Sequence, residues 1–338
     1  MDNQRTPRSY STGTVKRDNR QQQQKLVVIL ICIVIALLLV VFMTIIGTKI
    51  VLALTNGFNN ADPSAVIYKD ATIEKVQTLY GSLALVNGTH EYQFPTEANK
   101  NLANISGYRV AHSDPEKMPY KISLNTLVLD GAALTAAHQW LTDFNKATGQ
   151  KNAIITSAYR TAEEQASFSV PVGKSDHHTG FGVTLKIYDG TSTFEINSDP
   201  AYAWLAENAY KYGLIVRYPE DKSAITGISD YTNYFHYVGY APAMYMKQNN
   251  MCLEEFVAAI KSYSQSKPLE VTDANGQDWL IYYAACPGDM ATVKLPTNFT
   301  YTVSGDNEGG IIVCVSLSKT AFQQQQQQQE SESETSAQ

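Results

Sequence analysis

An uncharged apolar run at positions 26–47 constrains this chain more than any other feature of its sequence. A helix needs about 20 apolar residues to cross the hydrocarbon core of a bilayer, and this run of 22 residues is long enough. The apolar core of a cleavable signal peptide spans only about 7 to 15 residues. We therefore predict an uncleaved transmembrane helix over 26–47.

The charges that precede this run predict its orientation. Residues 1–25 hold six basic and two acidic residues, and the positive-inside rule places such a segment in the cytoplasm. The sequence thus predicts a disordered basic cytoplasmic tail at 1–25, a single-pass anchor at 26–47 and an extracytoplasmic bulk. The expected location is the cell membrane.

The composition of the remaining chain argues against one class of partner. Residues 26–338 hold 20 basic and 30 acidic residues and show no stripe of Lys and Arg, so no nucleic-acid partner is expected. The Gln-rich tail at 321–338 has too few apolar residues to offset the entropy of ordering, which predicts disorder. Nothing in the sequence indicates an oligomeric state.

The cysteines beyond the apolar run form an odd set. Cys252, Cys286 and Cys314 match no CxxC metal pattern. A disulfide between Cys286 and Cys314 and buried free thiols are both compatible with the sequence.

Apolar periodicity predicts both helices and strands in the bulk of the chain. Spacings of three and four predict an amphipathic helix over 125–147, and apolar runs predict strands at 153–157 and 214–218. Thr161 and Glu164 form a capping-box pattern that opens a short helix. Asp199 with Pro200 starts another helix, which Gly213 closes.

Two further segments carry structural information. Residues 181–188 alternate cleanly, so one face of a strand is buried and its other face, with Thr184 and Lys186, looks at solvent or a cleft. After a helix around 252–263, five short strands are predicted in 263–320, which we interpret as a separate small β-rich domain.

The two stretches SDHHTGFGVT (175–184) and ITGISDYTNYFHYVGY (225–240) carry a resemblance. They resemble the zinc motifs of the VanY-type D-alanyl-D-alanine carboxypeptidases, which read S-x-H-x-x-G-x-A-x-D and E-P-W-H followed by a strand similar to RYVG. Three more segments also resemble that family, in the family's order: GSLALVNGTHEYQFP, ITSAYRTAEEQ and VRYPEDKSAITG.

The resemblance covers roughly 75–262 and implies a fold. It implies an α+β carboxypeptidase-like domain there, built mainly from an antiparallel sheet with flanking helices. Residues 48–74 then form a linker and the start of the outer domain.

The resemblance also implies a zinc peptidase site, of which this sequence keeps little. The family's first histidine ligand matches His177, but its aspartate ligand falls on Thr184 and its second histidine ligand on Tyr234. The glutamate that acts as general base falls on Tyr231. Because three protein ligands normally hold a catalytic zinc, we expect an incomplete site, no bound cofactor and no hydrolysis.

This sequence retains more of the residues that the resemblance assigns to substrate binding than of those that it assigns to zinc. Arg160 matches the family arginine beside the scissile bond, and Gln165 and Ser175 match positions that line the same cleft. Lys186 lies on the cleft side of its strand and is a candidate for attracting a peptide carboxylate. A structural role for Arg160, bridging a helix and a strand, remains equally open.

Three functions follow as hypotheses. The leading one is an inactive, membrane-tethered relative that binds peptidoglycan stem peptides, in a bacterium that we expect to be Gram-positive. The second is an active zinc D,D-carboxypeptidase with a rearranged metal site, in which His236 or Asp230 joins His177. The third is an interaction or scaffold protein of the cell envelope.

Overall fold

The structure is a computed structural model that describes residues 66–96, 101–114, 116–229 and 231–318. The predicted membrane helix at 26–47 and both predicted disordered tails lie outside these ranges. No helix within the described ranges is long and apolar enough to span a bilayer.

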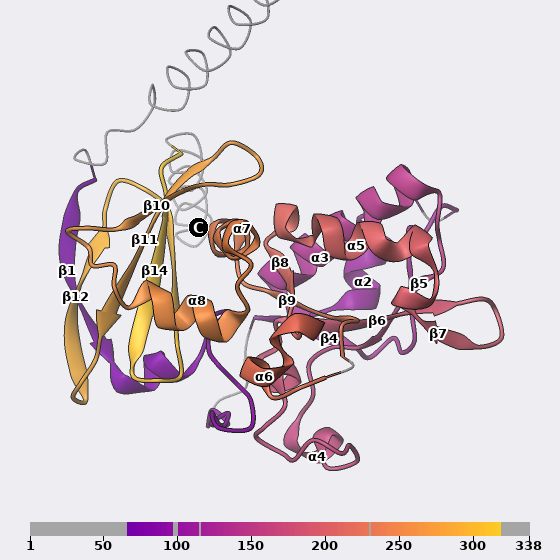
Figure 1. Ribbon diagram of the computed structural model, residues 1–338, viewed down its shortest axis with the longest axis horizontal. Coiled ribbons are helices and arrows are strands. Elements are labelled where there is room, and N and C mark those ends of the chain that lie inside the picture. The colour runs from indigo at the N-terminus through magenta and orange to yellow at the C-terminus, as the bar shows by residue number, and fades with distance from the viewer. Residues whose placement is uncertain (1–65, 97–100, 115, 230, 319–338) are drawn as a thin grey trace, which may run out of the picture. The chain divides into compact units, whose positions relative to one another are not determined.

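A six-stranded sheet lies in the right half of the structure in Figure 1, and we call it the central sheet of that half. Its strands follow the order β3-β5-β6-β9-β8, with β7 also paired to β6, and every pair is antiparallel except β3 with β5. The strands are β3 (Lys121–Ile122), β5 (Ala153–Ser157), β6 (Gly182–Tyr188), β7 (Thr193–Glu195), β8 (Leu214–Val216) and β9 (Tyr234–Tyr237). The strands predicted at 153–157, 181–188 and 214–218 are confirmed as β5, β6 and β8.

Helix α3 (Gly131–Thr148) packs against this sheet along the predicted apolar stripe. Trp140 in its middle is fully buried, and its ring lies 4.6 Å from that of Phe235 on β9. The helix ends at Gly149, whose φ of 75° is a conformation that glycine adopts without strain.

The start of α3 differs from the prediction over 125–147. Residues Val128–Asp130 form strand β4, which pairs with β2 (Leu102–Asn104), and this pairing takes them out of the helix. Asp130 then caps α3, because its carboxylate accepts the backbone N–H of Ala132.

The remaining helices are short, and several have 3-10 geometry. The capping box at Thr161 is confirmed at the start of α4. The helix predicted from Asp199 to Gly213 is present as three consecutive pieces, η5, α5 and η6. The elements are η2 (Lys75–Leu79), α2 (Ile105–Ala111), α4 (Ala162–Gln165), η3 (Asp176–Thr179), η4 (Ile196–Ser198), η5 (Pro200–Tyr202), α5 (Ala203–Asn208), η6 (Ala209–Tyr212), η7 (Glu220–Lys222) and α6 (Ser223–Thr226).

The five strands predicted in 263–320 are present. Four of them form a sheet in the order β10-β11-β14-β13, and β12 pairs with β1, which lies near the start of the described residues. The bounds are β1 (Tyr68–Glu74), β10 (Leu269–Thr272), β11 (Asp278–Ala285), β12 (Met290–Pro296), β13 (Tyr301–Gly305) and β14 (Gly310–Ser316).

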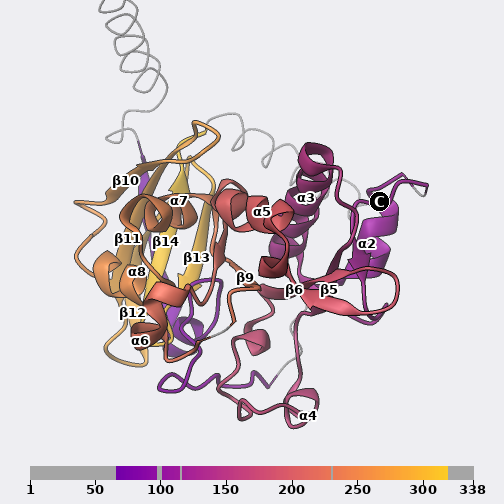
Figure 2. The ribbon, with the colours of Figure 1, turned by 45° about the vertical axis from the view of Figure 1, so that its right-hand side comes forward.

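These strands share a hydrophobic core with the segment before them. Helices α7 (Tyr240–Asn249) and α8 (Leu253–Ile260) lie beside the C-terminal strands (Figures 1 and 2), where α7 contacts β10 and α8 contacts β11. Helix α7 also contacts β8 of the six-stranded sheet. Phe256 of α8 belongs to one buried cluster with Ile281 of β11 and Ile312 of β14. The predicted boundary at 262 therefore separates two sheets but does not separate two cores.

The structure distinguishes between a disulfide and buried free thiols, which the sequence left open. Cys252, Cys286 and Cys314 are buried and free. The disulfide between Cys286 and Cys314 does not form, since Cys314 lies inside β14, opposite Ile281 and Thr302, whereas Cys286 follows the end of β11.

Candidate functional site

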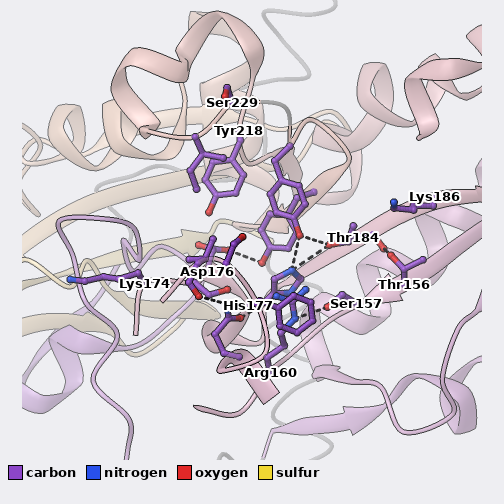
Figure 3. Close-up of a pocket in the computed structure, with 18 residues that line it drawn as sticks. Thr156, Ser157, Arg160, Lys174, Asp176, His177, Thr184, Lys186, Tyr218 and Ser229 are labelled. Atoms are coloured by element: carbon purple, nitrogen blue, oxygen red, sulfur yellow. Dashed lines mark hydrogen bonds between the residues drawn. The ribbon is translucent and has the colours of Figure 1, made fainter. Parts of the chain in front are cut away.

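A pocket of about 570 Å³ opens beside β6 (Figure 3). Its lining comes from the end of β5, from η3, β6 and β9, and from the loop that begins at Phe168. Thr184 and Lys186 both line it, which confirms that the second face of the strand over 181–188 looks into a cleft.

The structure brings together the four side chains that the motif register places in one pocket. The Nε2 atom of His177 lies 3.0 Å from the hydroxyl of Tyr231 and 3.3 Å from that of Thr184. The two hydroxyls lie 2.8 Å apart. The ring of Tyr234 stacks on Tyr231 at 5.3 Å, and its centroid is 4.5 Å from that of His177.

The hydrogen bonds of these residues indicate which of their atoms carry protons. His177 Nδ1 donates to the backbone oxygen of Ala158 at 2.5 Å. Burial, reinforced by nearby Arg160, lowers the pKa of His177 to about 3, so the imidazole is neutral and Nε2 is an acceptor. Both hydroxyls lie within hydrogen-bond distance of Nε2, and the shorter distance makes Tyr231 the better placed donor to it, which leaves Thr184 to donate to Tyr231. We call these three residues, His177, Thr184 and Tyr231, the neutral cluster.

A different set of groups lies directly behind the neutral cluster. Asp176 is fully buried, and its Oδ2 accepts from Tyr234 Oη at 2.8 Å and pairs with His236 Nδ1 at 2.6 Å. Its Oδ1 accepts from Arg217 Nε at 3.3 Å. The Arg217 fork donates two more bonds to Glu254, at 2.8 and 2.9 Å. We call Asp176, Arg217, His236 and Glu254 the ionic network.

Charge pairing in the ionic network outweighs its burial. Burial alone would raise the pKa of Asp176, but His236 and Arg217 hold it below its usual value. Burial likewise opposes the charge of Glu254, and Arg217 keeps its pKa lowered. The two carboxylates are therefore ionised and satisfied inside the protein.

Arg160 lies on the pocket wall with part of its guanidinium held in place. Its Nε donates to Ser157 at the end of β5, and its Nη1 donates to Gln165 of α4, at 2.9 and 3.1 Å. The ring of Phe168 covers the guanidinium at 3.7 Å. Arg160 thus bridges a strand and a helix, as one of the two open alternatives expected, and also lines the pocket.

The other predicted substrate residues lie on the same wall or at its edges. Ser175 and Gln165 line the pocket, although both are buried. Lys186 also lines it, and its ammonium pairs with Glu195 at 2.8 Å. Figure 3 shows Lys186 and Lys174 on opposite sides of the pocket.

Comparison with known proteins gives the family. Residues 92–240 match the family model "VanY: D-alanyl-D-alanine carboxypeptidase". The D-alanyl-D-alanine carboxypeptidase of Enterococcus faecium is 30% identical over 256 residues, which cover 73% of this chain and 79% of the relative. The chain belongs to the VanY family of D-alanyl-D-alanine carboxypeptidases.

Other relatives match over shorter ranges or through the fold. A D-alanyl-D-alanine carboxypeptidase of Enterococcus faecalis is 35% identical over 131 residues, covering 39% of this chain and 47% of the relative. The crystal structure of the vancomycin resistance D,D-dipeptidase VanXYg, in complex with a D-Ala-D-Ala phosphinate analog, has a TM-score of 0.63 at 23% identity. This match covers 74% of our chain and 99% of VanXYg, and it shows a common fold.

The residues around His177 do not fit the zinc ion that the VanY family implies. Zinc in proteins is held by His, Cys and carboxylate side chains, three of them in a catalytic site. Next to His177 this chain places the hydroxyls of Thr184 and Tyr231 instead. Across the described residues, no group of three His, Cys, Asp or Glu side chains is placed to hold a metal ion.

His236, one of the two residues considered for a rearranged metal site, does not supply a metal ligand in the structure. His236 is fully buried, and both of its ring nitrogens face acceptors: Asp176 Oδ2 and, at 2.9 Å, the backbone oxygen of Ser82. Both nitrogens are thus engaged in hydrogen bonds. Asp230 lies outside the described residues.

Gly182 makes room for Tyr234. In the VanY motif quoted above, an alanine stands where this chain has Gly182. A Cβ atom on Gly182 would lie 2.0 Å from Tyr234 Oη and 2.3 Å from its Cζ. The phenol at the family's histidine position is therefore accommodated by the loss of a methyl group on the neighbouring strand, where Gly182 pairs with His236, two residues along β9 from Tyr234.

Two features of the site were missed in the sequence. The ionic network was one, although a charged Arg217 next to an apolar strand could have indicated a buried ion pair. His178 was the other. It donates from Nδ1 to the Arg160 backbone oxygen and accepts the N–H of Gly173 at Nε2, so it fixes the loop that carries Lys174.

Proposed function

We propose that this chain is a membrane-anchored, extracytoplasmic VanY-family protein that binds peptidoglycan stem peptides without hydrolysing them. The observation that carries the proposal is the position of Arg160, which lies on the pocket wall next to a neutral cluster whose hydrogen bonds are already complete. The uncharged run at 26–47 supports the anchor.

Arg160 is suited to bind a peptide carboxylate. Two of its N–H groups are used to orient it, on Ser157 and Gln165, which leaves other donors of the fork for a ligand. A guanidinium held in one orientation binds a carboxylate with two parallel hydrogen bonds and loses little entropy. A stem peptide that ends in D-alanine presents such a carboxylate.

The groups that hydrolysis requires are not supplied by the neutral cluster. Burial raises the pKa of Tyr231 above its usual value of about 10, although Thr184 and Arg160 act in the opposite direction. A phenol of that kind cannot act as a general base at neutral pH. Loss of a complete catalytic unit usually removes nearly all of the rate enhancement.

The relatives support the choice of ligand. The Enterococcus faecium relative is a D-alanyl-D-alanine carboxypeptidase, and VanXYg, which shares the fold, is a D,D-dipeptidase seen with a D-Ala-D-Ala phosphinate analog. Peptides ending in D-Ala-D-Ala are therefore the first ligands to test.

The test is a calorimetric titration of the purified full chain, in detergent, with a pentapeptide stem ending in D-Ala-D-Ala. We expect binding without release of D-alanine, weakened about 10- to 100-fold by Arg160→Met. The control is Lys146→Met, which removes an exposed cation outside the pocket and should leave the affinity unchanged.

Two results would contradict the proposal in different ways. Absent binding, or binding that is indifferent to Arg160→Met, would favour the envelope interaction protein. Release of D-alanine, together with about one tightly bound zinc per chain that is lost in His177→Ala, would favour an active peptidase.

A further inference from the structure

A second pocket of about 450 Å³ adjoins the first. Three residues line both pockets, Val170, Lys174 and Ile228, so the two spaces meet along a shared wall. The far side of the second pocket is formed by residues 87–89 and by 225–227. A ligand longer than a dipeptide can therefore extend from one pocket into the other.

The wall between the pockets is a fixed loop, residues 168–174. The Nε2 atom of Gln165 donates to the Val170 backbone oxygen at 2.7 Å. At the other end, Gly173 donates to His178 Nε2 at 3.1 Å and accepts from the backbone N–H of Tyr92 at 2.8 Å. Gln165 also holds Arg160, so the loop and the arginine are positioned by the same side chain.

The accessible charges of the two pockets are positive. Arg160, Lys174 and Lys186 line them, and the remaining charged residue among their lining, Asp176, is fully buried and paired. The chain as a whole carries a net charge of −6. Each of the two lysines pairs with a glutamate at the edge of the site, so a ligand carboxylate reaches a lysine by replacing that glutamate.

The two lysines differ in how firmly their carboxylate partners are held. Glu195, the partner of Lys186, also accepts from Asn233 Nδ2 at 2.6 Å, which fixes it in place. Glu91, the partner of Lys174 at 3.2 Å, is about as exposed as Glu195, but Lys174 is its carboxylate's sole hydrogen-bonding or ionic partner among the described residues. A ligand carboxylate can replace Glu91 at Lys174 more easily than Glu195 at Lys186.

We propose that the two pockets form one groove for a peptide with two carboxylates, the terminal one at Arg160 and an upstream one at Lys174. The apolar side chains of Val170 and Ile228 line the path between the pockets. This inference rests on the proposed function and adds selectivity to it. In a stem peptide, the second carboxylate is the α-carboxylate of the γ-linked D-glutamate, and its amidation to isoglutamine removes the charge.

The test compares two pentapeptides by calorimetry on the full chain in detergent, L-Ala-γ-D-Glu-L-Lys-D-Ala-D-Ala and the same peptide with the D-glutamate α-carboxylate amidated. We expect the unamidated peptide to bind about fivefold more tightly. Lys174→Met should abolish this preference, whereas the matched variant Lys186→Met should keep it. The preference is a ratio measured within one variant, so it does not depend on the fraction of folded protein.

A further variant acts in the opposite direction. Glu91→Gln removes the carboxylate that competes for Lys174 and should increase the preference for the unamidated peptide. Equal affinities of the wild type for both peptides, or a preference that survives Lys174→Met, would overturn this inference alone. Binding of neither peptide would overturn the proposed function and this inference with it.

Discussion

Asp176 and His177 are neighbours in the chain, yet they belong to two different regions. One region holds buried ionised groups, and the other holds uncharged groups. Asp176 points into the ionic network, where Arg217, His236 and Glu254 are almost completely buried and paired. His177 points into the neutral cluster at the pocket wall, where an uncharged imidazole meets two hydroxyls. Tyr234 lies between them, since it contacts the ring of His177 and donates to Asp176.

The difference shows which parts of the site serve the fold. A buried charge that loses its partner is expensive, so the ionic network has to stay complete for the protein to remain folded. The residues of the neutral cluster are joined by hydrogen bonds between uncharged groups, each of which contributes only about 1 kcal/mol to the free energy of unfolding. Substitutions in the neutral cluster can therefore change its chemistry without unfolding the domain.

The strongest test of this contrast converts the neutral cluster into a metal site. Thr184→Asp, Tyr231→Glu and Tyr234→His together should allow about one zinc ion to bind per chain, because they place His and carboxylate donors around His177. Metal analysis after dialysis measures the uptake. The same triple variant with His177→Ala should bind none, and a triple variant without zinc would show that these four positions do not converge as ligands.

Breaking the ionic network should give the next largest effect. Arg217→Met leaves Asp176 and Glu254 without their cation in a buried site, and we expect a loss of about 3–5 kcal/mol in the free energy of unfolding. Urea unfolding followed by circular dichroism measures it. The matched variant Lys186→Met removes a partly exposed pair with Glu195 and should cost at most about 1 kcal/mol, so equal losses would refute the contrast.

The contact between Gly182 and Tyr234 predicts a smaller, coupled effect. Gly182→Ala should cost about 2 kcal/mol in the wild type because its Cβ overlaps the phenol. In a Tyr234→His background, whose shorter side chain leaves space, most of this cost should disappear. In a Tyr234→Phe background it should persist, because Cζ remains within 2.3 Å of the new methyl group. Additive losses in the Tyr234→His background would rule out this coupling.

The pH dependence of stability should reveal the neutral state of His177. Its pKa is about 3 in the folded protein, mainly through burial, and about 6.5 in an unfolded chain. Between these values the unfolded state binds one more proton, so the free energy of unfolding falls as the pH falls, by about 1.4 kcal/mol per pH unit. Urea unfolding at several pH values between 6.5 and 4.5 gives the free energy of unfolding as a function of pH. This pH dependence should be less steep in His177→Gln than in the wild type, by about the same amount. Equal pH dependence of the two proteins would count against a neutral, buried imidazole.

Local patterns in the sequence predicted much of the central sheet. Residues 153–157 became β5 because a run of apolar residues fits a strand that is covered on both faces. The capping box at Thr161 depends only on residues three apart, and it too is confirmed. The start of α3 was misplaced because β4 pairs with β2, about 25 residues earlier, and periodicity cannot show such a pairing.

The candidate site was predictable to the extent that its motif register fixed which side chains meet. That register brought Thr184 and Tyr231 to His177. It could not show that Gly182 and Tyr234 compensate each other, because that contact crosses two paired strands. The ionic network was equally hidden, since Arg217 and Glu254 are 37 residues apart in the chain and meet only in the folded protein.

The pairing of β1 with β12 has a consequence for the order in which the protein is completed. Glu74 lies opposite Met290 and Tyr68 opposite Pro296. The strand that is synthesised first among the described elements, β1, therefore pairs with one that is synthesised nearly last, β12. During synthesis β1 therefore emerges with an open edge that later strands must close. A shortened protein that begins after residue 74 would leave β12 with that open edge permanently and would be prone to associate through it.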